Sequence, residues 1–206
     1  SGIDENMPDD LYVSRPLRGK PYGLGLANAV NQMYTDVDPA AAGRLIYTQA
    51  ITKLVEAGFS PREILCTANV YSPKVTDNPE EAWRLKEMVL NGYLWAADTF
   101  RVPVISGKDS SSGTFVTKDG RRIDAPLTLN VLASGKVPDA SVLVPKPFQA
   151  RGDSLMLFQP GLVEATLDGS VLADRFSSDD KRGSKLSALD YEAVFDGWMA
   201  YYELFN

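Results

Sequence analysis

Histidine is absent from this chain of 206 residues, and there is a single cysteine, Cys66. Without histidine, the protein cannot form a Ser-His-Asp or Cys-His catalytic group or a histidine-ligated zinc site. One cysteine excludes an intramolecular disulfide and a thiolate metal cluster, and it fits a reducing, cytoplasmic setting. Cys66 follows Ile64 and Leu65, an apolar run typical of a buried structural thiol. Any chemistry must therefore use carboxylates, lysines, hydroxyls or backbone amides.

Long apolar runs are absent as well. No segment approaches the ~20 apolar residues of a membrane span, and the first residues lack the apolar stretch of a signal peptide. The net charge of −6 argues against a general binder of nucleic acid or of anionic membranes. Hydrophobic residues make up 44% of the chain and charged residues 23%, which favours a packed core over global disorder.

Capping residues predict two long helices. Asp38 is a good N-cap, Pro39 suits the first helical position, and Gly58 suits the C-terminal stop. Asn78 and Pro79 repeat this pattern at the start of another helix, which extends to about residue 100. Apolar patterning predicts strands at 11–14, 64–71, 126–137 and 153–158, a hairpin of 114–117 with 121–123, and a helix from about 187.

This order of elements predicts an α+β architecture, because hairpin-paired strands alternate with helices. We place a domain boundary near residue 149, after Pro145 and Pro147. The two expected domains are therefore 1–149 and 150–206. We expect the C-terminal domain to be truncated, because the chain stops directly after an aromatic-rich helix.

The most informative segment is residues 102–113, where an apolar strand leads into a polar stretch. This stretch contains Gly107, Lys108, Asp109 and the serines at 110–112. A loop with one cation and several hydroxyls at the end of a strand suits a phosphate or another oxygen-rich ligand. The alternative is an ordinary solvated turn, because loops are polar for many reasons.

Several motifs together resemble the phosphoribosylformylglycinamidine synthase family, which belongs to the aminoimidazole ribonucleotide synthetase-like superfamily. The resemblance extends from about residue 10 to 206, which covers only a fraction of such an enzyme. It is carried by Asp38-Pro39-Ala40-Ala41-Ala42, Arg44-Leu45, Thr67-Ala68-Asn69, 90–97, Val104-Ile105-Ser106-Gly107-Lys108-Asp109-Ser110, Ala125-Pro126-Leu127-Thr128-Leu129 and Arg151-Gly152-Asp153-Ser154-Leu155-Met156-Leu157.

The resemblance implies a fold and an activity. Residues 1–149 would be an N-terminal-type domain, a mixed or antiparallel sheet packed with helices, and 150–206 the beginning of a C-terminal-type α/β sandwich. The family uses ATP and Mg²⁺ to activate the amide oxygen of formylglycinamide ribonucleotide, which glutamine-derived ammonia then displaces. The implied partners are the remainder of the synthase chain, a glutaminase domain or subunit, and another module joined through the sheet as a dimer or pseudo-dimer.

The resemblance also suggests site residues, although none is assigned a catalytic role. Lys108 is the expected anion contact, with Asp109 orienting it or capping the turn. Asn69, Ser110, Ser111 and Ser112 are the further candidate contacts for a nucleotide or phosphate. The alternative for this set is a hydrogen-bonded junction between a strand and a loop.

The metal positions depart from the family pattern. Asp10 matches an acidic position ahead of the first strand, or it is simply a terminal aspartate. Where the family has Glu-Ala-x-x-Asn, this chain has Gln49 and Lys53, and a lysine argues against a normal magnesium site. Lys53 either replaces part of the metal's charge beside phosphate or is a solvated helix lysine. Asp168 stands where a small residue is usual, and it would repel a phosphate.

Three functions remain open at this point. The first is a working module of the ATP-dependent amidoligase, although the isolated chain would be inactive. The second is a degenerate half that holds nucleotide or serves only structure, which Gln49 and Lys53 favour. The third is a related enzyme such as a selenophosphate or thiamine phosphate kinase, whose aspartate-rich metal motifs the sequence does not show.

Overall fold

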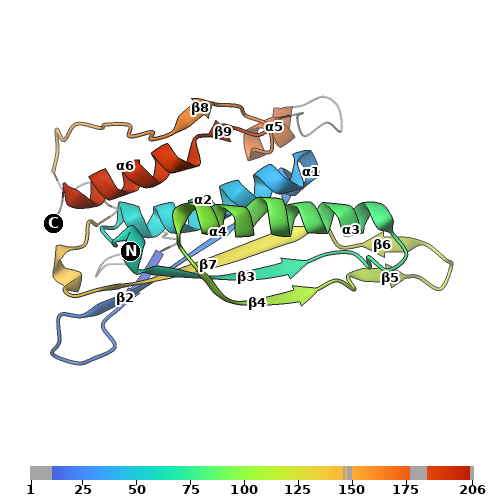
Figure 1. The fold of residues 1–206 in the computed structure, drawn as a ribbon, viewed down its shortest axis with the longest axis horizontal. Coiled ribbons are helices and arrows are strands. Elements are labelled where there is room, and N and C mark those ends of the chain that lie inside the picture. The colour runs from blue at the N-terminus through green and yellow to red at the C-terminus, as the bar shows by residue number, and fades with distance from the viewer. Residues whose placement is uncertain (1–10, 146, 148–149, 177–184, 205–206) are drawn as a thin grey trace.

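The computed structural model describes residues 11–145, 147, 150–176 and 185–204. Its centre is a five-stranded sheet in the order β1-β2-β7-β3-β4, in which only the β3–β4 pair is parallel (Figure 1). The strands are β1 (Leu11–Ser14), β2 (Gly23–Val30), β3 (Ile64–Tyr71), β4 (Val104–Ser110) and β7 (Thr128–Val137). This mixed sheet and its helices confirm the α+β prediction.

Helices cover one face of the sheet (Figure 1). They are α1 (Gln32–Val37), α2 (Pro39–Glu56), α3 (Pro79–Lys86), the π-helix η2 (Glu87–Leu94) and α4 (Trp95–Phe100). The core lies between α2 and the central strands, where Ile46, Ile51, Leu129 and Val131 are fully buried. Burial of such side chains stabilises the fold by about 1.5–3 kcal/mol each.

The predicted helix starts are confirmed at both long helices. The Asp38 carboxylate accepts a hydrogen bond from the Ala41 amide, and the Asn78 side chain accepts one from the Glu81 amide. Each satisfies an amide that the first turn of a helix leaves without a partner. Gly58, just after α2, has a φ of +96°, a conformation that side chains with a Cβ rarely adopt.

The helix that begins at Pro79 differs from the prediction in its middle. A π-helix interrupts it at Glu87–Leu94, and Gly92 has non-helical angles of φ −99° and ψ −109°. A Cβ added to Gly43 would lie 2.8 Å from the Cα of Gly92, so the two backbones are in direct contact where α2 crosses η2. The interruption lies at this close crossing.

Shorter elements complete the first part of the chain. The predicted hairpin is present as β5 (Thr114–Val116) and β6 (Arg122–Asp124), and the 3-10 helices are η1 (Pro61–Glu63) and η3 (Ala140–Val142). Gly120 has a φ of +84°, which the hairpin turn requires.

The C-terminal part lies on the outer side of the helices (Figure 1). It contains β8 (Leu162–Glu164), α5 (Val171–Phe176), β9 (Ala188–Leu189) and α6 (Tyr191–Glu203). Trp198 on α6 packs against Phe100 on α4 with ring centroids 4.7 Å apart, and it shares one hydrophobic cluster with the sheet core. The division at residue 149 stays a prediction, and the described segments on its two sides are packed together.

The predicted strand at 153–158 is wrong. These residues form no strand, and the two-stranded β8–β9 sheet begins only at Leu162. Leu155, Met156 and Leu157 are more than four-fifths exposed. Apolar patterning identified an extended segment, but a strand also needs a hydrogen-bonding neighbour, and the described residues supply none here.

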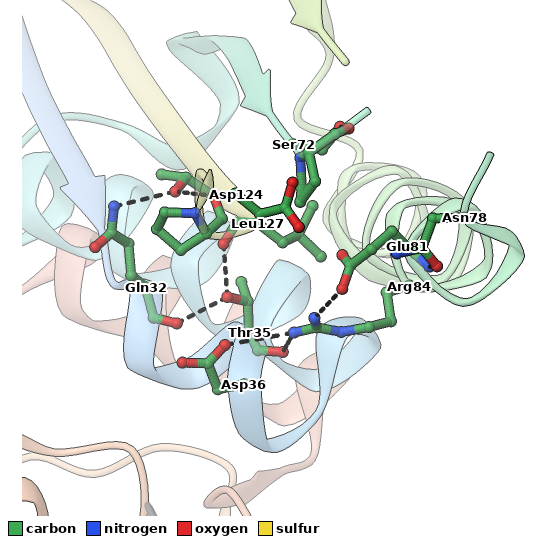
Figure 2. Close-up of polar contacts among 12 residues, drawn as sticks. Gln32, Thr35, Asp36, Ser72, Asn78, Glu81, Arg84, Asp124 and Leu127 are labelled. Carbon is green, nitrogen blue, oxygen red and sulfur yellow. Dashed lines mark hydrogen bonds and ion pairs between the residues drawn. The ribbon is translucent and has the colours of Figure 1, made fainter. Parts of the chain in front are cut away.

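Arg84 joins α3 to α1 at one end of the helix layer (Figure 2). Its guanidinium donates to Oε1 of Glu81 at 2.8 Å and to the carbonyl of Thr35 at 3.1 Å, and it lies 3.4 Å from Asp36. The buried Thr35 hydroxyl lies 2.7 Å from the Leu127 carbonyl, which links the same helix to the start of β7. Oε2 of Glu81 is buried without a hydrogen-bond partner in the described part of the chain.

Candidate anion-binding site on the open sheet face

The sheet face turned away from α2 and α4 is not covered by the described residues, and we call it the open face. Side chains alternate between the two faces along each strand, so alternate residues point outward. The outward positions on the four longer strands are Leu24, Leu26, Asn28, Val30, Leu65, Thr67, Asn69, Tyr71, Ser106, Lys108, Ser110, Thr128, Asn130, Leu132, Ser134 and Lys136. None of these described positions carries an acidic side chain.

A β-bulge decides which residues of β4 reach the open face. Cys66 pairs with Val104, but Thr67 pairs with Ser106, so Ile105 is an extra residue in β4. An extra residue reverses the alternation of every later side chain in the strand. Lys108 therefore points to the open face, beside Asn69, instead of into the helix layer.

Three asparagines and Lys108 form a continuous polar row across four strands. Asn130 on β7 pairs with Asn69 on β3, which pairs with Lys108 on β4. Asn28 on β2 donates its side-chain amide to the side-chain oxygen of Asn130. With strands about 4.8 Å apart, the row is about 14 Å long. We call these four residues the amide row.

The predicted phosphate loop is mostly strand. Residues 104–110 belong to β4, and only residues 111–113 lie outside a strand before β5. The amide of Gly113 donates to the Ser72 carbonyl at 2.9 Å, and that of Thr114 to the Ser112 carbonyl at 2.8 Å. Because these two amides are used within the chain, they are not available to an anion, and the side chains of β4 are the main candidate donors.

The predicted contact residues divide between the two faces. Asn69, Lys108 and Ser110 lie together on the open face, and Ser106 lies with them. Asp109 points to the opposite side, where its negative charge adds to the effect of burial in raising the pKa of Tyr93 on η2. The Ser111 hydroxyl donates to Asp109 at 3.3 Å. The exposed Ser112 follows in the turn.

Lys53 lies away from this group. Its ammonium donates to the backbone carbonyl of Asn28 at 2.6 Å. Asn28 lies on β2, which β7 and β3 separate from β4 in the sheet. Gln49, one turn earlier on α2, donates to the hydroxyl of Tyr34 at 3.2 Å. Asp168 accepts a hydrogen bond from the Lys185 amide at 3.0 Å, within the C-terminal part.

The described residues do not bring a set of metal ligands together around Gln49. Asp10 lies outside the described residues. Gln49 is neutral, and the lysine one turn away on α2 brings a positive charge. Within the described ranges, no group of three or more carboxylates or thiols could hold a metal ion. Magnesium needs several hard oxygen ligands, so these residues do not fit it.

Asn28 and Asn130 were not predicted as site residues. Both occupy polar positions in otherwise apolar strands, with Val30 and Leu132 as outward neighbours. This interruption of an apolar alternation was the only available signal. Their meeting depends on the pairing of β2 with β7, which no local pattern specifies.

The arrangement of helices on one face of a mixed sheet is the aminoimidazole ribonucleotide synthetase-like fold. Thermotoga maritima PurL complexed with FGAR has this arrangement, with a TM-score of 0.57 over 90% of this chain and 28% of that chain at 14% identity. A crystal structure of phosphoribosylformylglycinamidine synthase II from the same organism gives a TM-score of 0.53 at 25% identity, over 67% and 21%. The predicted fold class is therefore confirmed. No helix among the described residues is long and apolar enough to cross a membrane.

The relatives found by sequence comparison are the same kind of protein, the PurL subunit of phosphoribosylformylglycinamidine synthase. The chain is 28% identical to this subunit from Thermobifida fusca over 169 residues, or 82% of the chain. It is 29% identical to that from Chlorobium chlorochromatii over 162 residues and 27% identical to that from Helicobacter hepaticus over 155. The chain spans about a fifth of the length of these relatives. No protein-family model matches it.

Proposed function

We propose that this chain is one module of a phosphoribosylformylglycinamidine synthase, a ligase of purine biosynthesis. The complete enzyme would convert formylglycinamide ribonucleotide to formylglycinamidine ribonucleotide with ATP and glutamine-derived ammonia. Similarity to PurL subunits over about four-fifths of the chain supports this proposal. Thermotoga maritima PurL has also been solved with ADP and with ATP, which supports nucleotide binding by such a fold.

The chemistry requires positive charge beside phosphate. An amide oxygen is a poor leaving group, and transfer of the terminal phosphoryl group of ATP to this oxygen, with release of ADP, makes it a good one. Ammonia then adds to the carbon as phosphate departs. Charge develops on the phosphate oxygens, and a cation held in place before the reaction stabilises it.

The observation that carries the proposed role is the position of Lys108 beside Asn69, Ser106 and Ser110. These side chains offer an ammonium, an amide and two hydroxyls on one acid-free face. A phosphate oxygen could accept hydrogen bonds from several of them at once. In this role Lys108 supplies the charge, and Asn69 and the serines orient the anion.

Another candidate is a module that holds nucleotide without turnover. The relatives found do not favour it. Its support comes from α2, where Gln49 and Lys53 occupy the expected metal positions and contact Tyr34 and the Asn28 carbonyl. In such a module, nucleotide binding would not depend on Mg²⁺.

The proposed partners are the rest of the synthase and its glutaminase domain or subunit, acting in the cytoplasm. One neighbouring structure is described as PurLQS from Thermotoga maritima. The open face would pair with the sheet of another module, as a dimer or pseudo-dimer. Large apolar side chains on this face support the proposal that another module packs against it, because a sheet face left in water is normally polar.

Calorimetric titration of the 206-residue protein with ATP and with ADP, each with and without Mg²⁺, tests the proposal. We expect binding that falls at least about tenfold in Lys108→Met, because a charge-assisted hydrogen bond contributes about 1.5–3 kcal/mol. Lys118→Met, the same change on the exposed hairpin turn, should leave affinity unchanged.

Three outcomes discriminate between the candidates. Binding that requires Mg²⁺ favours the working module, and binding that ignores Mg²⁺ favours the nucleotide-holding one. Failure to bind either nucleotide at millimolar concentration, or an equal loss in both lysine variants, would contradict the role of Lys108.

A further inference from the structure

We propose that Tyr71 stacks against the base of a nucleotide whose phosphates contact Lys108, and that this ring makes the site selective for nucleotides over other phosphates. The inference rests on the proposed anion site. It adds the direction in which the ligand lies on the open face and the side chain that recognises its base.

Tyr71 lies beside the proposed anion contacts. It is the last residue of β3, it pairs with Ser110 on β4, and it points to the open face two residues after Asn69. Asn69 pairs with Lys108. With about 3.3 Å between residues along a strand and about 4.8 Å between strands, the Cα atoms of Tyr71 and Lys108 are about 8 Å apart. A ribose can bridge this distance, so a base at Tyr71 and a phosphate at Lys108 can belong to one ligand.

The other directions from Lys108 offer no aromatic side chain among the described residues. Toward the start of the strands the outward neighbours are Ser106 and Thr67, and across the sheet the amide row leads to Asn130. The other aromatic side chain that the described part of the central sheet turns outward is Tyr12 on β1, which β2 and β7 separate from β3. Every base has a π-face that stacks on an aromatic ring. Tyr71 is therefore the stacking surface within reach of the anion contacts.

The turn between β4 and β5 holds the ring of Tyr71 in place. A Cβ added to Gly113 would lie 3.0 Å from Cε1 of Tyr71, so the ring packs directly against this glycine. The Gly113 amide donates to the Ser72 carbonyl at 2.9 Å, and the Ala125 amide donates to the Gly113 carbonyl at 2.7 Å, which fixes the turn. Tyr71 is nevertheless 47% exposed. A ring that is held on one side and open elsewhere loses little freedom when a ligand binds to it.

The anion contacts by themselves do not distinguish a nucleotide from another phosphate. Lys108, Asn69 and the serines donate to charged oxygens, which tripolyphosphate and ATP both offer. Selectivity therefore needs a contact with the part of the ligand that only the nucleotide has. The alternative role for an exposed ring on this face is packing against another module, and the experiment distinguishes the two.

Calorimetric titration with ATP and with tripolyphosphate, at one Mg²⁺ concentration, tests the role of the ring. The wild-type protein should bind ATP more tightly than tripolyphosphate. Tyr71→Leu should weaken ATP binding at least about fivefold, the loss expected when a stacked base loses its aromatic partner, and should leave tripolyphosphate binding unchanged. Tyr71→Phe keeps the ring and should bind ATP as the wild type does. Tyr12→Leu makes the same change at another exposed tyrosine of the open face and should alter neither affinity.

A measurement on the wild-type protein is independent of any effect of the substitutions on folding. Tetranitromethane nitrates exposed tyrosine rings, and mass spectrometry of peptides locates the product. Saturating ATP should protect Tyr71 from nitration, and tripolyphosphate should not. Tyr12, which is 64% exposed, should react to the same extent with either ligand.

The outcomes separate this inference from the anion site on which it rests. Unchanged ATP binding in Tyr71→Leu, together with a loss in Lys108→Met, overturns the role of Tyr71 and leaves the anion site standing. If Tyr71→Leu also weakens self-association in sedimentation, the ring belongs to the packing between modules. An equal loss of ATP and tripolyphosphate binding in Tyr71→Leu, or equal protection by both ligands, likewise overturns base recognition. A wild-type protein that does not bind ATP overturns both proposals.

Discussion

Asn69 and Lys108 lie directly opposite each other in adjacent parallel strands, and both point to the open face. In this chain Lys108 has this direction because Ile105 is an extra residue that the pairing of β4 with β3 skips. The register of the proposed anion site therefore passes over one backbone irregularity, and this leads to the first prediction.

Deletion of Ile105 should straighten β4 and keep anion binding. Without the extra residue, Ser106 follows Val104 directly, so the pairs of Thr67 with Ser106 and of Asn69 with Lys108 are kept and Lys108 still points to the open face. Calorimetric titration with ATP should therefore give the same affinity for the deletion variant as for the wild type. Ile105→Ala keeps the bulge, and because Ile105 is 58% exposed, it should change the free energy of unfolding by less than about 1 kcal/mol. Loss of ATP binding in the deletion variant alone would show that Ile105 is an ordinary strand residue and would contradict the bulge.

Gly43→Ala should destabilise the protein although alanine favours helices. The new Cβ would lie 2.5 Å from the carbonyl oxygen of Met88 and 2.8 Å from the Cα of Gly92, and backbone atoms cannot move aside cheaply. Overpacking of this kind costs about 1–3 kcal/mol, more than the ~1 kcal/mol that helix propensity returns. Thermal unfolding of Gly43→Ala and Gly43→Ser should show a larger loss for serine. A higher melting temperature in Gly43→Ala would refute the close contact.

Arg84→Met should cost about 2 kcal/mol of unfolding free energy, because it leaves the Glu81 carboxylate and the Thr35 carbonyl without their donor. Glu81 already has one buried oxygen without a partner among the described residues. Removal of Arg84 takes the donor from its other oxygen as well, so the buried negative charge of Glu81 then destabilises the folded state. Glu81→Gln should therefore restore part of the stability in the Arg84→Met background. A double-mutant cycle by urea denaturation measures this coupling, and additive losses would argue against it.

Stability should fall in alkali partly because of Cys66. Burial raises the pKa of this thiol from 9.0 to about 11, and a hydrogen bond with Tyr47 acts in the opposite direction. The folded state therefore holds the thiol proton more tightly than the unfolded state does. The resulting stabilisation of the folded state is complete below pH 9 and is lost as the pH rises to about 11. Two pKa units correspond to about 3 kcal/mol.

The measurement compares wild type with Cys66→Ala in urea denaturation at several pH values from about 8 to 11. The comparison is needed because tyrosines and lysines titrate in the same range. As the pH rises, the free energy of unfolding of the wild type should fall relative to that of Cys66→Ala by up to about 3 kcal/mol. Parallel curves would show that ionisation of Cys66 makes no contribution.

Local sequence signals predicted much of the fold. The caps at Asp38 and Asn78, the stop at Gly58 and the strand predicted at 126–137 are all confirmed, because each depends on neighbours within a few positions. The π-helix at Glu87–Leu94 was not predicted, since it lies where α2 crosses it. The strand at 153–158 was predicted but is absent, because patterning does not show whether a neighbour is available.

The sequence by itself determined the chemistry of this protein: no histidine, one buried thiol, a lysine among serines, and amides in apolar strands. Only the tertiary structure decided which of these groups meet. It joined Asn28 to Asn130 across 102 positions, turned Lys108 to the open face and placed Lys53 elsewhere. The physical reason is that strand register and side-chain direction follow from pairing between distant segments, and one extra residue reverses the face to which every later side chain points.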